Sequence, residues 1–324
     1  MSEPFVRPDA RAYLDALAAN PRPTMSDALI AQMRMIPPEI MAGMLEVMEL
    51  PVGEIATVAD VTMPGPGGDI ALRMFDARPS RDPGPVVVFY HGGGFVVGSI
   101  DTHAALAAEI ARLLDLPVIS IEYRLAPEHK WPAAPDDAEA ATRWIAENGQ
   151  TFGREFTGLV LCGDSAGGNL ALVVALDLRE RPAALPLVAL IPIYPKTDSS
   201  RVHPSFDAFT DGFGLPAEDM AYFEQAFSPD PHSHRHSVML ADLAGLPATL
   251  MVTCSLDVLR DEGRAFAAKA VEAGVPVIYR EMQGNIHGCF TFRKAIPSAQ
   301  QDLVRLMELA RTMIAEVHAG HGLT

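Results

Sequence analysis

Residues 159–168 read LVLCGDSAGG, and this stretch decides the fold. A short apolar run ends in a glycine, and a longer run rich in leucine, alanine and valine begins at residue 170. The two runs predict a buried strand over Leu159–Cys162 that turns sharply into a helix over 166–180. Ser165 lies at the turn, and a glycine two positions to either side leaves space for the tight backbone. The pattern therefore predicts a serine hydroxyl held above the end of a strand.

The same alternation of short apolar runs and helical stretches continues on both sides. The runs are apolar at consecutive positions, which is typical of strands buried on both faces of a parallel sheet between helices. Two earlier runs, Ile55–Met63 and Asp69–Phe75, are joined by a turn of proline and glycine and predict two more strands. The sequence thus predicts an α/β fold with a doubly wound, mostly parallel sheet of eight strands. The other predicted strands are Val86–Tyr90, Val118–Tyr123, Leu187–Ile193, Thr249–Cys254 and Val277–Arg280, and the other predicted helices cover 102–114, 135–148, 260–273 and 298–318.

Two segments break the alternation and predict a cover over the sheet. About 55 residues, six of them aromatic, separate the strand ending near Tyr194 from the one beginning near Thr249. A structureless loop of that length is unusual in a compact domain. The first fifty residues hold seven of the 15 methionines, helically spaced from Met41 to Met48; they pack in the core or form a soft apolar cover over a pocket. The predicted division is a helical cap from 1–50 and 196–246 and a core from 51–195 and 247–324.

The net charge limits the binding partners that we expect for the chain, and the cysteine count indicates the cell compartment. The 324 residues include 25 Lys and Arg against 41 Asp and Glu, for a formal net charge of −16. Without a basic cluster, this charge argues against nucleic acid or an anionic membrane as partner. No apolar stretch is long enough to span a bilayer, and the N-terminus lacks the apolar core of a signal peptide. The three cysteines lie far apart in sequence and do not suggest a disulfide scaffold. We therefore expect a cytoplasmic protein that acts on a small molecule.

A second glycine-rich stretch, HGGGF at residues 91–95, directly follows a predicted strand. Consecutive glycines leave backbone N–H groups uncovered, and such groups can hold the negative oxygen of an acyl-transfer intermediate. The N–H of Ala166, the residue after Ser165, is a further donor. A phosphate-binding loop is the alternative, but the Lys-Ser/Thr pair that opens the helix of such a loop is absent.

A nucleophilic serine needs a base, and the base needs a carboxylate to orient it. His287 lies within GNIHG at 284–288, after the last predicted strand, and Asp257 follows the strand before it. The order serine, aspartate, histidine is expected when all three residues project from loops at the carboxyl edge of one sheet. Asp261 and Glu262 remain alternatives for the acid.

Together these motifs resemble the hormone-sensitive-lipase family of α/β-hydrolases, in its bacterial esterase branch. The resemblance implies an α/β-hydrolase fold with a helical cap, and chemistry that uses no metal or cofactor. It implies that Ser165 is the nucleophile, that His287 is the general acid and base, and that Asp257 orients His287. The implied oxyanion hole consists of the N–H groups of Gly93, Gly94 and Ala166. The matching stretches are HGGGF at 91–95, YRLAPEH at 123–129, PAAP at 132–135, GDSAGG at 163–168, DVLRDE at 257–262 and HG at 287–288.

The chain departs from the family at two positions near the expected site. Val258 stands where the family usually has proline, which frees a backbone N–H and is expected to loosen the turn after Asp257. Cys289 stands where the family often has an aromatic residue, two positions after the histidine. Neither change removes a group that the reaction needs.

We expect a serine carboxylesterase for short- to medium-chain acyl esters. A lipase, lactonase, deacetylase or amidase would use the same apparatus. A remote alternative is a non-catalytic small-molecule receptor of the same fold, similar to plant gibberellin receptors, which should lack part of the triad. Related esterases often pair through an edge strand of the sheet, which suggests a homodimer.

Two further groups of polar residues have simpler interpretations. His232, His234 and His236 alternate in sequence and would share one face of an extended strand, which suggests a metal. No fourth ligand is evident, so a solvated loop is the simpler interpretation. Asp136 and Asp137 are expected near the start of a helix, where their charge favours the helix dipole.

Overall fold

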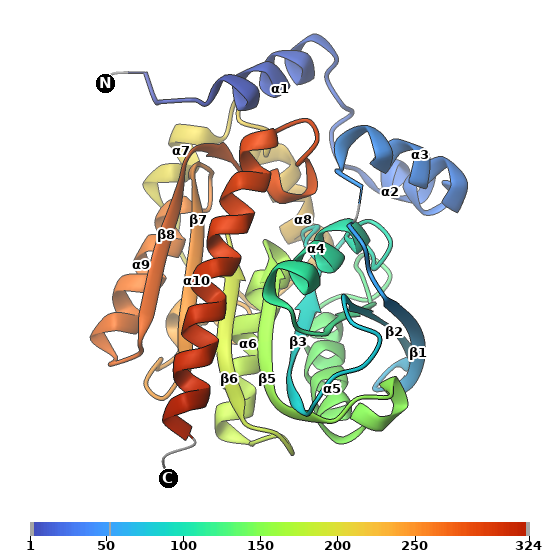
Figure 1. Cartoon of the computed structure of the whole chain (residues 1–324). Helices are drawn as coiled ribbons and strands as arrows, with labels where there is room; N and C mark the ends of the chain where they lie inside the picture. The colour runs from blue at the N-terminus through green and yellow to red at the C-terminus, as the bar shows by residue number, and fades with distance from the viewer. Residues whose placement is uncertain (1–2, 52, 322–324) are drawn as a thin grey trace.

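One sheet of eight strands runs through the computed structural model, which describes residues 3–51 and 53–321 (Figure 1). The strands lie in the order β1-β2-β4-β3-β5-β6-β7-β8. β1 is antiparallel to β2 and β2 to β4, and the remaining pairs are parallel. The predicted fold class is therefore confirmed. The strands are β1 (Thr57–Gly65), β2 (Gly68–Asp76), β3 (Gly84–Tyr90), β4 (Val118–Ile121), β5 (Phe156–Asp164), β6 (Leu187–Ile193), β7 (Ala248–Leu256) and β8 (Val277–Ile286).

Helices cover both faces of the sheet (Figure 1). α5 (Ala133–Glu147), α6 (Ala166–Glu180) and α9 (Arg260–Glu272) pack on one face, and α4 (Ala104–Leu114) and α10 (Pro297–His321) pack on the other. Successive side chains of a strand point to opposite faces, so central strands between two helical layers are apolar at consecutive positions along much of their length. No helix in the described part of the chain is both long and apolar enough to cross a membrane.

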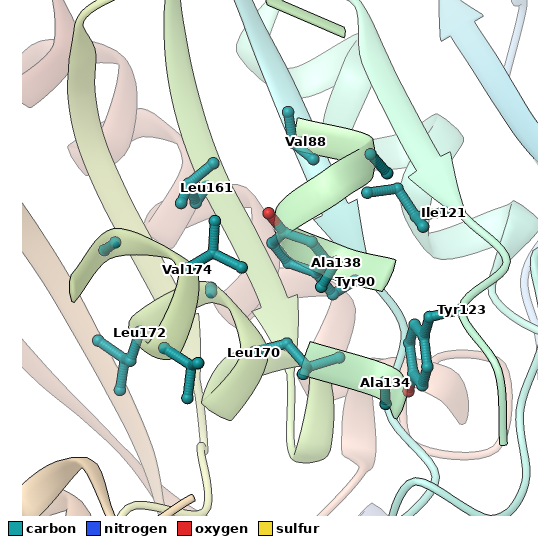
Figure 2. Close-up of a cluster of buried hydrophobic side chains, with 14 of the residues drawn as sticks. Val88, Tyr90, Ile121, Tyr123, Ala134, Ala138, Leu161, Leu170, Leu172 and Val174 are labelled. Carbon is teal, nitrogen blue, oxygen red and sulfur yellow. The ribbon is translucent and has the colours of Figure 1, made fainter. Parts of the chain in front are cut away.

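The face beneath α5 and α6 fixes the two strands whose ends carry the glycine-rich stretches (Figure 2). Val88 and Tyr90 of β3 are buried in the same cluster as Leu161 of β5 and Leu170 of α6. Tyr90 Oη shares a 2.5 Å hydrogen bond with Thr142 Oγ1 of α5, which gives the buried hydroxyl a partner. β3 and β5 therefore end at fixed positions beside each other.

The strand ends differ from the prediction most clearly at the edge of the sheet. The sequence pattern predicts a strand ending at Arg280, but β8 continues to Ile286. β8 pairs with β7 alone. Polar side chains beyond Arg280 can therefore face water, and they interrupt the apolar run without ending the strand. β5 likewise reaches Asp164, and β4 already ends at Ile121.

Short helices from the N-terminus and from the segment after β6 lie at one end of the sheet (Figure 1). The methionine spacing predicts only α3 among them. α1 buries two side chains, Ala10 and Leu14, and α2 buries one, Ile30, so both give a weak periodic signal. These helices are α1 (Pro8–Ala19), α2 (Asp27–Arg34), α3 (Pro38–Met48), α7 (Pro204–Phe209) and α8 (Ala217–Phe227).

Hydrogen bonds tie the segment between α1 and α2 to α8, although about 200 residues separate them in sequence. Asp219 accepts from Arg22 Nη2 and from the N–H of Met25, both at 3.0 Å. Tyr222 Oη donates to Asp27 Oδ1 at 2.9 Å. The two segments outside the regular alternation therefore contact each other.

The interpretation of Asp137 needs a correction. α5 begins at Ala133, earlier than predicted, and Asp136 lies in its first turn. Asp137 is fully buried and accepts two hydrogen bonds of 2.8 Å from the guanidinium of Arg124. A buried carboxylate needs such a partner. Asp137 therefore fixes the segment after β4 to α5 instead of serving the helix dipole in water.

Candidate active site

Ser165 occupies a sharp turn between β5 and α6. Its φ of 56° and ψ of −116° are unusual for a residue with a side chain. The N–H of Ser165 donates to Ile193 O at 2.9 Å, which ties the turn to β6. A Cβ at Gly163 would collide with the backbone of Gly167, and a Cβ at Gly167 would collide with the carbonyl of Tyr90. Close backbone packing therefore requires both glycines of the motif.

His287 connects Ser165 to Asp257. His287 Nε2 lies 2.8 Å from Ser165 Oγ, and His287 Nδ1 lies 2.8 Å from Asp257 Oδ2. Asp257 directly follows β7 and His287 directly follows β8, so the parallel strands bring together groups as far as 122 positions apart in sequence. An imidazole in this position can take the hydroxyl proton while the carboxylate orients its ring.

The carboxylate of Asp257 sets the proton affinity of His287. Burial alone would lower the pKa of His287, but the adjacent carboxylate outweighs burial and raises this pKa above its usual value. The charges of Asp164 and Glu262 act in the same direction. A higher pKa makes the imidazole a stronger base toward a hydroxyl.

The loop after β3 places two glycines in the wall of the cavity that contains Ser165. Gly93 and Gly94 have φ angles of 121° and 62°, which favour glycine. Among the described residues, no acceptor takes the N–H of either glycine. Ala166 lines the same cavity and begins α6, so its N–H has no acceptor within the helix. The wall of the cavity therefore contains three backbone donors that a ligand oxygen can use.

Buried side chains hold this loop from below. Tyr123 Oη donates to His91 O at 2.7 Å, and the two rings stack with centroids 4.2 Å apart. The N–H of Gly92 donates to Asp164 Oδ1 at 2.9 Å. Burial lowers the pKa of His91 to about 3, so this ring is neutral and serves as packing.

The cavity above Ser165 has a volume of about 250 Å³. Met25, Met220 and Phe223 give it an apolar wall. The ring of Phe223 lies directly against the glycine loop, because a Cβ on Gly94 would come within 2.5 Å of it. A wall of flexible thioethers and phenylalanine rings suits an apolar ligand of limited size.

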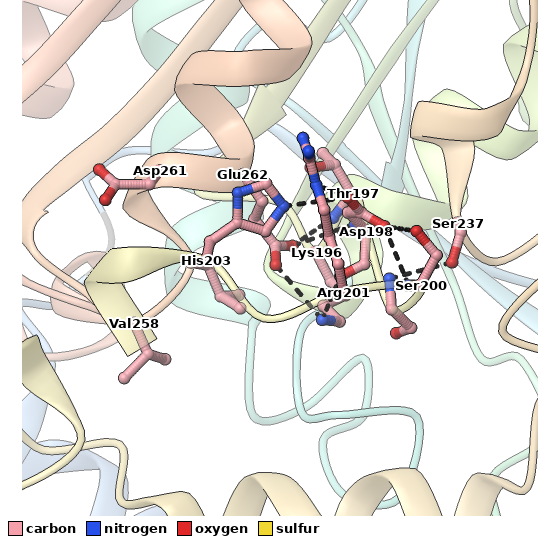
Figure 3. A network of polar contacts seen from close by, with 12 residues as sticks. Lys196, Thr197, Asp198, Ser200, Arg201, His203, Ser237, Val258, Asp261 and Glu262 are labelled. Atoms are coloured by element: carbon pink, nitrogen blue, oxygen red, sulfur yellow. Dashed lines mark hydrogen bonds and ion pairs between the residues drawn. The ribbon is translucent and has the colours of Figure 1, made fainter. Parts of the chain in front are cut away.

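Glu262 of α9 holds the segment that follows β6 (Figure 3). Its carboxylate accepts the N–H groups of Thr197 and Asp198 at 2.5 and 3.3 Å and pairs with Lys196 Nζ at 3.3 Å. Burial raises the pKa of Glu262, and the charge of Lys196 offsets part of this effect. Asp261 pairs with arginines of its own helix. Both alternative acids, Asp261 and Glu262, therefore form their ion pairs with groups other than His287.

The row of histidines after α8 does not form an extended strand. Residues 231–236 form turns, with His232 and His234 exposed and His236 buried. His236 Nε2 lies 2.9 Å from Ser199 Oγ. Within residues 3–51 and 53–321, no cluster of three His, Cys, Asp or Glu side chains is arranged to hold a metal.

Two residues next to the site carry no clear sequence signal. Tyr194 is buried with a φ of 34°, and its ring centroid lies 4.9 Å from that of His287. Its place at the end of β6, on the same sheet edge as Ser165, is the feature that could have indicated it. His103 lines the cavity from the start of α4, where no local pattern marks it.

Known proteins resemble the chain in sequence. A family described as having the alpha/beta hydrolase fold matches residues 87–291. Esterase LipI of Mycobacterium tuberculosis is 34% identical over 271 residues, which cover 82% of this chain and 84% of the relative. Ethyl acetate hydrolase of Pseudomonas putida is 36% identical over 250 residues, covering 75% and 78% of the two chains.

Solved structures resemble the chain over nearly its whole length. An ester hydrolase from the metagenome of Lake Arreo superimposes with a TM-score of 0.86 at 35% identity, covering 96% of this chain and 99% of the other. The hyperthermophilic esterase of Pyrobaculum calidifontis gives a TM-score of 0.85 at 33% identity, with coverages of 96% and 99%.

Proposed function

The chain belongs to the α/β-hydrolase fold family, and from this membership we propose that it is a carboxylic ester hydrolase with Ser165 as its nucleophile. The hydrogen-bonded series Ser165, His287 and Asp257 carries the proposal, because nucleophilic acyl transfer needs a hydroxyl, a base and a group that orients the base. Two relatives are named as an esterase and as an ethyl acetate hydrolase, and these names support the same class of reaction. The proposed oxyanion hole consists of the N–H groups of Gly93, Gly94 and Ala166.

In the first half of the proposed reaction, Ser165 Oγ attacks the ester carbonyl while His287 Nε2 takes the hydroxyl proton. The carbonyl oxygen becomes negative and accepts hydrogen bonds from the backbone donors of the glycine loop and of α6. Asp257 stabilises the imidazolium that forms. The proton then passes from His287 to the departing alkoxide, the alcohol leaves, and the acyl group remains on Ser165.

In the second half, water replaces the alcohol. His287 takes a proton from the water as its oxygen attacks the acyl carbonyl, and the same backbone donors hold the second oxyanion. Collapse breaks the bond to Ser165 Oγ, which recovers its proton from His287. The products are one carboxylic acid and one alcohol for each ester and water consumed.

We place short- to medium-chain acyl esters as substrates because the cavity is small and largely apolar. Its volume of about 250 Å³ lies below the usual range of about 300–1,000 Å³ for drug-sized ligands. Phe223 fills the space over Gly94 and limits extension on that side. A series of p-nitrophenyl esters from acetate to laurate should therefore show the highest kcat/KM below laurate; a steady rise up to laurate would contradict this preference.

We also propose that 1–50 and 196–246 act together as a cap over a core made of 51–195 and 247–324. The hydrogen bonds from Arg22 and Met25 to Asp219 support this division. So does the lining of the cavity, which combines Met25 of the first segment with Phe223 of the second and Ser165 of the core.

The decisive experiment compares Ser165→Ala with wild type in hydrolysis of a short p-nitrophenyl ester. We expect kcat to fall by roughly a million-fold, because removing the nucleophile alone costs about as much as removing a whole triad. Ser80→Ala, at an exposed position, is the matched control. A fluorophosphonate should label wild type at Ser165 and leave Ser165→Ala unlabelled, and a folded Ser165→Ala that retains near wild-type turnover would refute the proposal.

A further inference from the structure

A second pair of ionisable side chains lies buried beside Ser165. His103 and Asp164 line the cavity and are 7% and 3% exposed. His103 Nε2 lies 3.5 Å from Asp164 Oδ1, and the same oxygen accepts the N–H of Gly92 at 2.9 Å. Asp164 directly precedes Ser165, and Gly92 directly precedes the glycines of the proposed oxyanion hole. The pair is therefore connected both to the nucleophile turn and to the glycine loop.

The contacts of His103 fit an imidazole that carries protons on both ring nitrogens. Nε2 faces the Asp164 carboxylate, which can only accept, and Nδ1 lies 2.9 Å from Thr102 Oγ1. That hydroxyl lies 3.1 Å from Ser99 O, to which it can donate, and it accepts the N–H of Ser99 at 2.8 Å. With its hydrogen on Ser99 O, Thr102 Oγ1 accepts from Nδ1–H. An imidazole with protons on both nitrogens carries a positive charge.

The surroundings of His103 favour this charge. Glu49 and Glu122 contribute negative charge near it, and His91, whose ring centroid is 5.5 Å away, is kept neutral by burial. Glu49 is in turn paired with the buried Arg293 at 3.0 Å. Burial alone would lower the pKa of His103, but the charge of the paired carboxylate outweighs it, and the pKa is raised.

We propose that protonated His103 is a positioning residue for the oxyanion hole, which neutralises Asp164 and keeps that carboxylate bonded to Gly92. This inference rests on the proposed reaction at Ser165, because it concerns the oxyanion formed there. An uncompensated carboxylate next to the nucleophile would repel the negative oxygen, and the repulsion is strong where water is excluded. The imidazolium removes the repulsion while the hydrogen bond to the loop is kept.

The charge of His103 can be measured in the wild-type protein by proton–nitrogen correlation NMR of its histidine rings. We expect both ring nitrogens of His103 to show the shifts of a protonated imidazole at pH 7. The signal is assigned by its absence from His103→Gln or, if that variant does not fold, by its contacts with the Thr102 methyl group. A neutral His103 ring at pH 7 would overturn the proposal, whether or not the chain hydrolyses esters.

The effect of the charge on the reaction can be measured with His103→Gln and with the double variant His103→Gln/Asp164→Asn. The single change leaves Asp164 charged, so we expect kcat to fall by roughly tenfold or more with little change in KM. The second change removes the repelling charge, and its amide oxygen can still accept from Gly92. The double variant should therefore recover much of the lost kcat. His232→Gln, at an exposed histidine, is the matched control and should match wild type.

A double variant as slow as or slower than His103→Gln would also overturn the proposal. Two losses of packing add to each other, whereas removing two opposite charges leaves no net charge beside the oxyanion. Titration of active sites with a fluorophosphonate ensures that each kcat refers to folded enzyme. Failure of the proposed function has a different signature: Ser165→Ala would keep its activity, while the NMR result for His103 would be unaffected.

Discussion

Two hydrogen bonds and a neighbouring turn fix the carboxylate behind His287. Asp257 Oδ2 faces His287 Nδ1, and Asp257 Oδ1 accepts the N–H of Leu259 at 2.9 Å. Val258, which replaces the usual proline, is expected to loosen this turn. Its carbonyl instead accepts from Ser205 Oγ of α7 at 2.7 Å, so the turn is held by a neighbouring element. The substitution therefore leaves the carboxylate in position.

Asp257→Asn should separate the orienting role from packing, because the amide has nearly the same shape. Its NH₂ group can face Nδ1 and force the wrong tautomer on His287, so we expect kcat to fall by roughly 10⁴-fold. Asp261→Asn is the control, since Asp261 pairs with arginines on α9, and it should change kcat little. A large loss in Asp261→Asn beside near-normal Asp257→Asn would assign the acid to Asp261.

The pH dependence follows from the proton affinity of His287. Only the neutral imidazole can accept the serine proton, so activity is lost as pH falls through the pKa of His287. Because the Asp257 carboxylate raises this pKa above 6.5, the acid limb of kcat/KM should have its midpoint above that value. Initial rates across a pH series test this, and a profile that stays flat from pH 5 to 8 would contradict the role of His287.

The glycine loop contacts α8 through Gly94, which lies against Phe223, and through Phe95, which stacks on Phe227. The contact at Gly94 can be altered by adding one methyl group. Gly94→Ala adds a methyl group against the Phe223 ring and strains a φ of 62°. If this moves a proposed oxyanion donor, kcat should fall by roughly 10²–10³-fold. Gly43→Ala is the control, because a Cβ there meets nothing within 4 Å.

Adding Phe223→Ala to Gly94→Ala separates the two causes of the loss. The smaller side chain removes the collision but leaves the backbone strain, so we expect partial recovery of kcat. Full recovery would mean that the ring alone is responsible, and no recovery would assign the whole effect to the backbone.

Arg34 joins α2 to the glycine loop and to the segment after β4. Its guanidinium donates to Val96 O at 2.9 Å and to Ala126 O at 3.1 Å, and it pairs with Glu128. Arg34→Ala removes these donors, and we expect a loss of about 1–2 kcal/mol in the free energy of unfolding, together with faster proteolysis of the first fifty residues. Arg305→Ala on the exposed side of α10 should leave both measurements unchanged.

The central strands and the turn at Ser165 could be predicted because their signals are local. Burial on both faces makes β3 and β5 apolar at consecutive positions in their central parts, and close backbone packing imposes glycine at 163 and 167. The expected neighbours His287 and Asp257 came from their order along parallel strands.

Other features set by partners distant in sequence, which follow no strand order or motif, could not be predicted. The apolar pattern predicts a strand that is shorter than β8, because β8 is an edge strand with polar side chains. α1 and α2 bury few residues of their own and depend on contacts with other elements. The pair of His103 and Asp164 is 61 positions apart and is brought together only by the folded sheet and α4. No period or motif encodes such a contact.

At the scale of the whole molecule, the net charge of −16 does not determine the character of the site. The charged residues that line the cavity are largely paired, as Arg22 with Asp219 and Lys196 with Glu262. The acidity therefore belongs mainly to the outer surface, where it is expected to keep polyanions away. An ester without charge is not subject to that long-range repulsion.

The labelling rate of the three cysteines measures how often the folded protein opens. Cys162, Cys254 and Cys289 are fully buried, and burial raises the pKa of the Cys162 and Cys254 thiols. Reaction with a thiol reagent needs an exposed thiolate, so we expect none at pH 8 in the native protein and reaction of all three in denaturant. The native labelling rate should equal the rate of global unfolding measured by circular dichroism, while Ser80→Cys should react at once. Labelling of Cys254 or Cys289 faster than unfolding would instead reveal local opening of β7 and β8 beside the proposed triad.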